Sequence, residues 1–121
     1  MSGMKVTSGP GGSFPLTIPN GATGLSAAIS LGNNRLARID MPATWVAANL
    51  TFQVSADDVT YTNLYDSLGT EYTVIAAASR SILLNLADFL GIRYLKIRSG
   101  TASVPVNQTA DRALTLGVVG A

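Results

Sequence analysis

Apolar and polar residues alternate along much of this chain, and turn-forming residues interrupt the alternation at short intervals. This pattern is typical of antiparallel strands that turn one face to a core and the other to water. It predicts eight or nine short strands, at residues 14–18, 25–31, 36–41, 50–54, 60–65, 71–77, 81–84, 92–98 and 114–119. Strands this short, with no room for a helix of normal length, predict an all-β fold, an antiparallel β-sandwich of the jelly-roll type.

The alternation also predicts which side chains face the core. In residues 36–41, we expect Ala37, Ile39 and Met41 to point inward and Arg38 and Asp40 to point outward.

Three segments depart from the alternation. The stretch from Pro42 to Ala48 predicts one helical turn, with Trp45 closing an end of the core. Residues 86–91 predict a short helical or irregular link. Met1 to Ser13 is rich in Gly and Ser and predicts an extended arm that gains order by contact. The remaining residues, 14–121, form one sandwich domain, long enough to bury a core without disulfides or metal.

The composition changes this picture in one respect, which is the scarcity of charge. Charged residues make up 12% of the chain, about half the usual share of roughly 25% in soluble domains. The net charge is +1 and the mean hydropathy is +0.32. Small neutral residues must therefore cover the surface, and such a surface costs little to desolvate. We expect a homo-oligomer, with a monomer of neutral surface as the alternative.

The chain lacks residue types that several classes of function usually need. The chain has no histidine and no cysteine, which removes the commonest general base and the usual zinc ligands. We therefore predict no enzyme activity, no catalytic residue and no cofactor. The basic residues are scattered, so no nucleic-acid surface is expected. No segment has the length of a membrane span, and the N-terminus lacks the apolar core of a signal peptide, so cytoplasmic synthesis is expected.

The acidic residues Asp57, Asp58, Asp66 and Glu71 raise the question of a calcium site. Their spacing matches no regular set of calcium ligands, and aspartate at the start of a turn commonly binds its own backbone. We predict turn residues and no metal.

Two groups of residues are candidates for binding. Tyr94, Lys96 and Arg98 share the outward face of one predicted strand, where they would pair with carboxylates of an adjacent strand or contact a partner subunit. Further candidates for contact with a partner come from the arm and the strand after it: Met4, Val6, Pro10 and Phe14. Trp45, Tyr61 and Tyr65 are candidates for stacking on sugars, although such rings also serve to close core ends with their polar tips in water.

The most distinctive stretch, from Met41 to Val74, reads MPATWVAANLTFQVSADDVTYTNLYDSLGTEYTV, and RYLKIRSGT, PVNQ and ADRALTL follow it. With these motifs, residues 39–116 resemble small proteins encoded in tailed-phage genomes and in phage-derived gene transfer elements. The layout is also similar to discoidin-like, galactose-binding-type jelly rolls, in which a strand of the YLKIR type runs through the core.

The resemblance to phage proteins implies a structural protein of the virion, made in the host cytoplasm. The favoured role is a capsid decoration or head-spike base subunit that binds the major capsid protein, other virion proteins and its own copies, as a trimer by analogy. The alternatives are a carbohydrate-binding module of an adhesin and a tail or baseplate subunit. The resemblance supplies no catalytic residues, and similarity of fold does not transfer a ligand.

Overall fold

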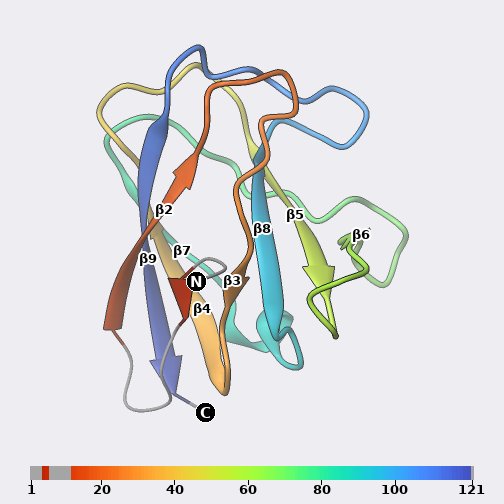
Figure 1. The fold of residues 1–121 in the computed structure, drawn as a ribbon. Coiled ribbons are helices and arrows are strands. Elements are labelled where there is room, and N and C mark those ends of the chain that lie inside the picture. Colours follow the sequence, from red (N-terminus) through yellow and green to blue (C-terminus); the bar gives the residue numbers. More distant parts are fainter. Residues whose placement is uncertain (1–3, 6–11, 121) are drawn as a thin grey trace.

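Two β-sheets pack face to face in the computed structural model, which describes residues 4–5 and 12–120 (Figure 1). The five-stranded sheet has the order β1 (Met4–Lys5), β3 (Ile29–Ser30), β8 (Tyr94–Ser99), β5 (Leu50–Ser55) and β6 (Thr62–Asn63). The four-stranded sheet has the order β2 (Gly12–Ile18), β9 (Arg112–Gly120), β4 (Asn34–Asp40) and β7 (Ser81–Leu83). Neighbouring strands are antiparallel except β1 and β3, which are parallel. The predicted β-sandwich is confirmed.

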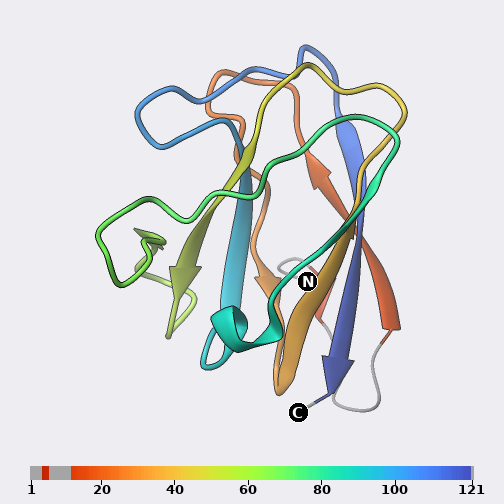
Figure 2. The same ribbon diagram turned by 180° about the vertical axis from the view of Figure 1, so that it is seen from behind.

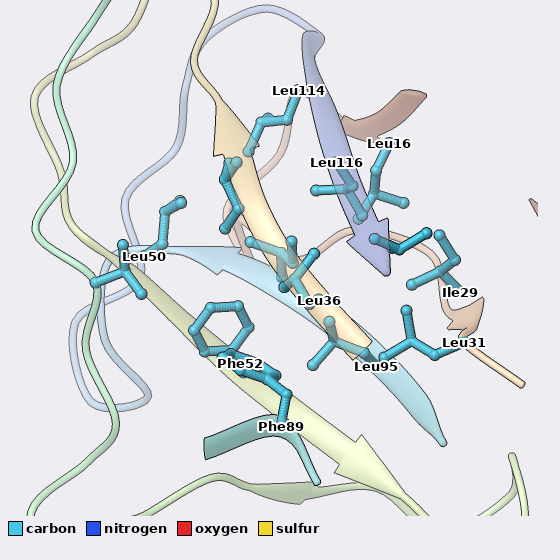
Figure 3. Close-up of a cluster of buried hydrophobic side chains, with 14 of the residues drawn as sticks. Leu16, Ile29, Leu31, Leu36, Leu50, Phe52, Phe89, Leu95, Leu114 and Leu116 are labelled. Carbon is cyan, nitrogen blue, oxygen red and sulfur yellow. The ribbon is translucent and has the colours of Figure 1, made fainter. Parts of the chain in front are cut away.

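The core lies between the inner faces of the two sheets (Figure 3). Phe52 of β5 is fully buried, and Phe89 packs edge-on against it with ring centroids 5.8 Å apart. Phe89 comes from η1 (Leu86–Phe89), a short 3-10 helix at the lower end of the sandwich (Figure 2). This element confirms the short helical link expected at 86–91. Other fully buried side chains come from both sheets: Ile18, Ile29, Leu31, Leu36, Ile39, Leu50, Leu95, Ile97, Leu114 and Leu116.

A β-bulge in β4 changes the predicted facing of that strand. The pairing with β9 shifts between Leu36 and Arg38, which leaves Ala37 as the extra residue. A bulge of this kind places two residues opposite one and resets the alternation. Leu36 and Ile39 are therefore both fully buried, and Ala37 is only half-buried, against our expectation that it points inward.

The helical turn predicted at Pro42 to Ala48 is wrong, because no helix forms in this segment. The side chain of Gln108 accepts a hydrogen bond from the Val46 amide at 2.7 Å and donates to the Val46 carbonyl at 2.8 Å. The Trp45 indole N–H donates to the Ala48 carbonyl at 3.1 Å. A helical turn would pair the Val46 amide with the Pro42 carbonyl, but the amide donates to Gln108 and the carbonyl accepts from the Ser79 amide at 3.0 Å.

Several other strand boundaries differ from the prediction. Of the strand expected at 25–31 only Ile29–Ser30 forms, and of the strand expected at 60–65 only Thr62–Asn63. β2 begins at Gly12, since Gly12 and Ser13 already pair with β9. Residues 71–77 form no continuous strand. They contribute only two isolated bridges, between Tyr65 and Glu71 and between Leu50 and Val74. Within residues 4–5 and 12–120, no helix has the length and apolar character needed to cross a membrane.

Candidate binding face

The outer face of the five-stranded sheet gathers half of the binding candidates that the sequence singled out. Leu95 and Ile97 of β8 are fully buried, so Tyr94, Lys96 and Arg98 point away from the core. Their partners on β5 are polar as well, in the pairs Ser55 with Tyr94, Gln53 with Lys96, and Thr51 with Arg98. The predicted common face of Tyr94, Lys96 and Arg98 is confirmed.

The edge of this face is formed by β6 and the residues beside it. Asn63 lies opposite Gln53 in the register of β5 and β6. Leu64 packs against the core, so its neighbours Asn63 and Tyr65 lie on the outer side of the strand. Tyr61, two residues before Asn63, lies on the same side. We call Tyr61, Asn63 and Tyr65 the β6 row.

The two tyrosines of the β6 row differ in their surroundings. The Lys96 ammonium lies 4.3 Å from the centroid of the Tyr61 ring, a cation–π contact between neighbouring strands. The Tyr61 hydroxyl donates to the Asp58 carboxylate. Burial, followed by this hydrogen bond, raises the pKa of Tyr61. Tyr65 is 52% exposed and offers its ring to solvent.

Asp58 is placed for this contact by a tight turn after β5. Asp57 Oδ1 accepts hydrogen bonds from the amides of Val59 and Thr60, both at 2.9 Å. These backbone hydrogen bonds lower the pKa of Asp57. Ser55 Oγ accepts from the Asp58 amide at 3.0 Å, and Asp58 has a φ of 61°. Asp57 is thus a turn residue, as predicted. In the parts of the chain that the structure describes, no three His, Cys, Asp or Glu side chains are grouped to hold a metal.

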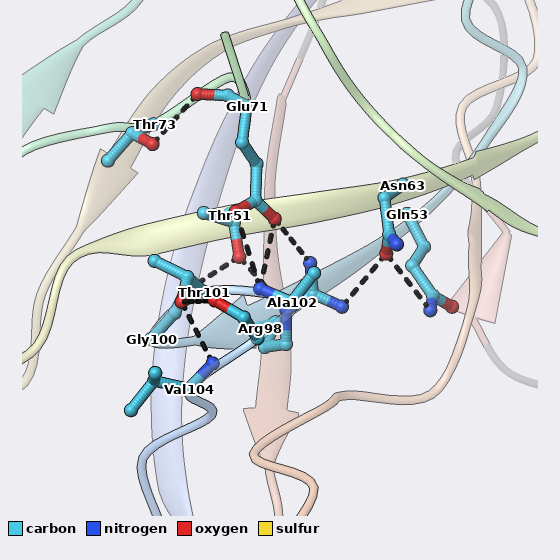
Figure 4. A network of polar contacts seen from close by, with 11 residues as sticks. Thr51, Gln53, Asn63, Glu71, Thr73, Arg98, Gly100, Thr101, Ala102 and Val104 are labelled. Atoms are coloured by element: carbon cyan, nitrogen blue, oxygen red, sulfur yellow. Dashed lines mark hydrogen bonds and ion pairs between the residues drawn. The ribbon is translucent and has the colours of Figure 1, made fainter.

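Arg98 holds the middle of the face together (Figure 4). Its Nε donates to Thr51 Oγ1 at 3.0 Å, its Nη1 to Asn63 Oδ1 at 3.1 Å, and its Nη2 to Glu71 Oε2 at 2.8 Å. Glu71 in turn accepts the Ala102 amide at 3.0 Å. Four segments that are distant in sequence therefore meet at one guanidinium group.

Of the two roles expected of Arg98, this network shows pairing with a carboxylate, and contact with a partner subunit stays a prediction. Arg98 is only 5% exposed, and a guanidinium removed from water needs acceptors within the protein. The alternative interpretation, pairing with a carboxylate of a neighbouring segment, describes its bond to Glu71. The roles of Glu71 and Asn63 in this network were not predicted. The outward position of a basic residue in a central strand was the only signal in the sequence that an acceptor had to be near.

The network also fixes the orientation of the Asn63 side chain. An arginine has only donors, so the atom that faces Arg98 Nη1 must be the carboxamide oxygen. Gln53 Nε2 donates to the same oxygen, at 3.5 Å. Asn63 Nδ2 and Gln53 Oε1 make no hydrogen bond within the described residues. A donor and an acceptor are thus presented side by side on the outer face.

The remaining candidates lie elsewhere. Trp45 is half-buried against the core, in the loop that precedes β5, whereas Tyr61 follows the other end of that strand. Phe14 of β2 is half-buried against the core, and its contact with a partner stays a prediction. Arg93 lies 5.8 Å from the Tyr94 ring centroid. Val6, Pro10 and the side chain of Met4 lie outside the described part of the chain.

Of three comparisons with known proteins, only the one with solved structures found a similar fold. No family model matches the chain, and no curated protein matches it. Among solved structures, CBM32-1 from a family 31 glycoside hydrolase of Clostridium perfringens aligns with a TM-score of 0.51 and 13% identity, over 85% of this chain and 75% of that chain. Chitosan-binding module 1 from a chitosanase/glucanase of Paenibacillus sp. IK-5 aligns with a TM-score of only 0.31 and 17% identity, over 84% and 74%. The first similarity is one of fold and agrees with the β-sandwich that the sequence predicted. The resemblance to phage proteins has no counterpart in these matches and stays a prediction.

Proposed function

We propose that this chain is a carbohydrate-binding module and that its glycan lies on the outer face of the five-stranded sheet, along the β6 row. The observation that carries the proposal is the half-exposed Tyr65 on the same face as Asn63 Nδ2 and Gln53 Oε1, a donor and an acceptor that the network around Arg98 leaves available. The similarity to a CBM32 module supports a binding function of this class on this fold.

The residues on this face suit the chemistry of a sugar. A sugar ring has apolar C–H surfaces, which pack on an aromatic ring, and hydroxyl groups, which both donate and accept hydrogen bonds. Tyrosine supplies a ring with a polar end. Asn63 Nδ2 supplies two donor hydrogens, Gln53 Oε1 an acceptor, and the Lys96 ammonium further donors. Binding sites commonly combine an apolar surface with a few fixed polar groups of this kind.

The carbohydrate-binding interpretation was the alternative to a capsid decoration subunit, and the observations favour it. The outer face offers groups that recognise hydroxyls, and one of the similar solved structures is CBM32-1 from a family 31 glycoside hydrolase. The virion role, with capsid proteins as partners, stays a prediction from the sequence resemblance. An adhesin of a phage or a cell surface would combine the two.

A glycan array followed by calorimetry tests the proposed function. We expect the protein to bind at least one class of glycan, and Tyr65→Ala to weaken that binding by about tenfold, or 1.4 kcal/mol. Tyr65→Phe keeps the ring and should bind nearly as well as the wild type. Leu68→Ala, at an 89% exposed position of the same hairpin, is the matched control. No binding to any glycan, or equal binding by Tyr65→Ala, would contradict the proposal.

A further inference from the structure

We infer that the β6 row binds an extended oligosaccharide chain, and not a single sugar ring. This inference rests on the proposed function and concerns the length and direction of its ligand. It follows from the order of the three side chains along the strand, which is tyrosine, amide, tyrosine.

The first step is the distance between the two rings. Residues 62 and 63 pair with β5, and the Leu64 amide donates to the Phe52 carbonyl at 3.0 Å. Tyr65 is bridged to Glu71. The backbone from Tyr61 to Tyr65 is therefore extended, and four residues at about 3.3 Å each separate the two Cα atoms by roughly 13 Å. This span is longer than one sugar ring, so a single sugar contacts one tyrosine at a time.

The second step is the chemistry between the rings. Asn63 lies midway between the two tyrosines. Its Oδ1 atom accepts from Arg98 and Gln53, which fixes the orientation of the amide and leaves Nδ2 for a ligand. A glycan running along β6 would place one sugar unit on each tyrosine and a hydroxyl or ring oxygen at the amide between them. At the Tyr61 end, the Lys96 ammonium covers one face of the ring, 4.3 Å from the centroid, so a sugar unit would pack on the rest of the ring and take the ammonium as a donor at its edge.

The third step is the rigidity of the row. Asn63 is held by Arg98, which is held by Thr51 and Glu71, and Glu71 is bridged to Tyr65. Side chains that are already ordered lose little entropy when a ligand binds. The side chains of Asn63 and Tyr61, the latter through Asp58 and Lys96, and the backbone at Tyr65 are thus held in place, which favours a ligand that spans the row.

The test is calorimetry with three series of β-1,4-linked sugars, those of glucose, galactose and N-acetylglucosamine, each from the monosaccharide to the hexasaccharide. In the series that binds, we expect affinity to rise about tenfold or more between one and four units and then to level off. Tyr61→Ala and Tyr65→Ala should each remove this gain. Tyr61→Phe and Tyr65→Phe keep the rings and should retain it, and thermal unfolding of each alanine variant checks that it is folded.

The outcomes separate the inference from the proposed function. A monosaccharide that binds as tightly as the tetrasaccharide, with an effect of Tyr65→Ala alone, would overturn the extended ligand and leave the carbohydrate-binding module in place. Equal binding of the tetrasaccharide by wild type and Tyr61→Ala would likewise overturn the inference. No binding in any series or on the array would overturn both.

Discussion

A guanidinium group that leaves water needs an acceptor for each of its donor nitrogens. Arg98 finds these acceptors in Thr51, Asn63 and Glu71, which come from β5, β6 and the segment after it. The side chains of Arg98 and Glu71 are 6% and 16% exposed, so their ion pair is largely shielded from solvent. At the scale of the residue, the binding face therefore depends on a buried charge that must stay paired.

Removing the acid of this pair should cost much of the stability of the domain. Glu71→Ala leaves Arg98 buried without its counter-charge, and we expect a loss of about 3 kcal/mol in the free energy of unfolding. The double variant Arg98→Met with Glu71→Leu replaces the charges by apolar groups and should regain much of this loss. Urea unfolding of the three proteins checks this. A loss below about 0.5 kcal/mol for Glu71→Ala, the level of an exposed pair, would contradict it.

The raised pKa of Tyr72 predicts that the folded protein loses stability at alkaline pH. The Tyr72 ring packs against Phe52 and Phe89, and its hydroxyl donates to Asp88 at 2.8 Å. Burial first, and then this hydrogen bond, raise the pKa of Tyr72 to about 12. The unfolded value is about 10, so the contribution of Tyr72 is complete below pH 10 and is lost as the pH rises towards 12.

The measurement is unfolding by denaturant between pH 9 and pH 12 for wild type and Tyr72→Phe. We expect the wild type to lose more stability over this range than the variant. The variant should keep part of the loss, because the pKa of Tyr61 is raised as well. Equal pH dependence of the two proteins would show that the Tyr72 phenol does not couple to folding.

At the scale of the element, the sequence predicted where the longer strands lie. The prediction failed where contacts between residues distant in sequence determine the local structure. The alternation in 92–98 placed Tyr94, Lys96 and Arg98 on one face, since period two needs only local information. The bulge at Ala37 depends on the register with β9, and the loop at Trp45 on Gln108. Neither partner can be read from the local pattern.

The candidate site was predicted in part for the same reason. Tyr61 and Tyr65 were proposed for sugars, and Lys96 for a partner, as unrelated groups. They share one face because β6 pairs with β5 and β5 with β8. That pairing is set by tertiary contacts, as is the use of residues 71–77 as a bridged segment instead of a strand.

Gly100 directly follows β8 and begins the loop whose Ala102 amide donates to Glu71, and its surroundings leave no room for a side chain. Its φ is +91°, and a Cβ would lie 2.5 Å from the Val104 carbonyl oxygen and 2.7 Å from the Val106 nitrogen. We expect Gly100→Ala to cost about 3 kcal/mol or more, from backbone strain and overpacking together.

Gly69→Ala separates these two causes. Gly69 also has a positive φ, +86°, but nothing lies within 4 Å of the added Cβ. This variant should cost only the strain, about 1–2 kcal/mol. Thermal and urea unfolding give both values, and similar losses for the two variants would rule out the steric clash at Gly100.

At the scale of the whole molecule, the sandwich positions an open polar face on a low-charge domain. The small share of charged residues, 12%, underlies the prediction of a homo-oligomer, for which a trimer was favoured. Light scattering behind a sizing column gives the mass in solution: a discrete multiple of 12.5 kDa is the expected result, and a monomer would contradict it. Either result is compatible with glycan binding, because the β6 row belongs to one chain.

The most direct test of the glycan-binding face is a nuclear magnetic resonance titration of the ¹⁵N-labelled protein. The probe is the β-1,4-linked tetrasaccharide that binds best in calorimetry. We predict that the largest shifts fall on the amides of residues 61–65 and on the side-chain amide of Asn63. Shifts centred instead on Val46 and Gln108, in the loops beside Trp45, or an unchanged spectrum would contradict the account.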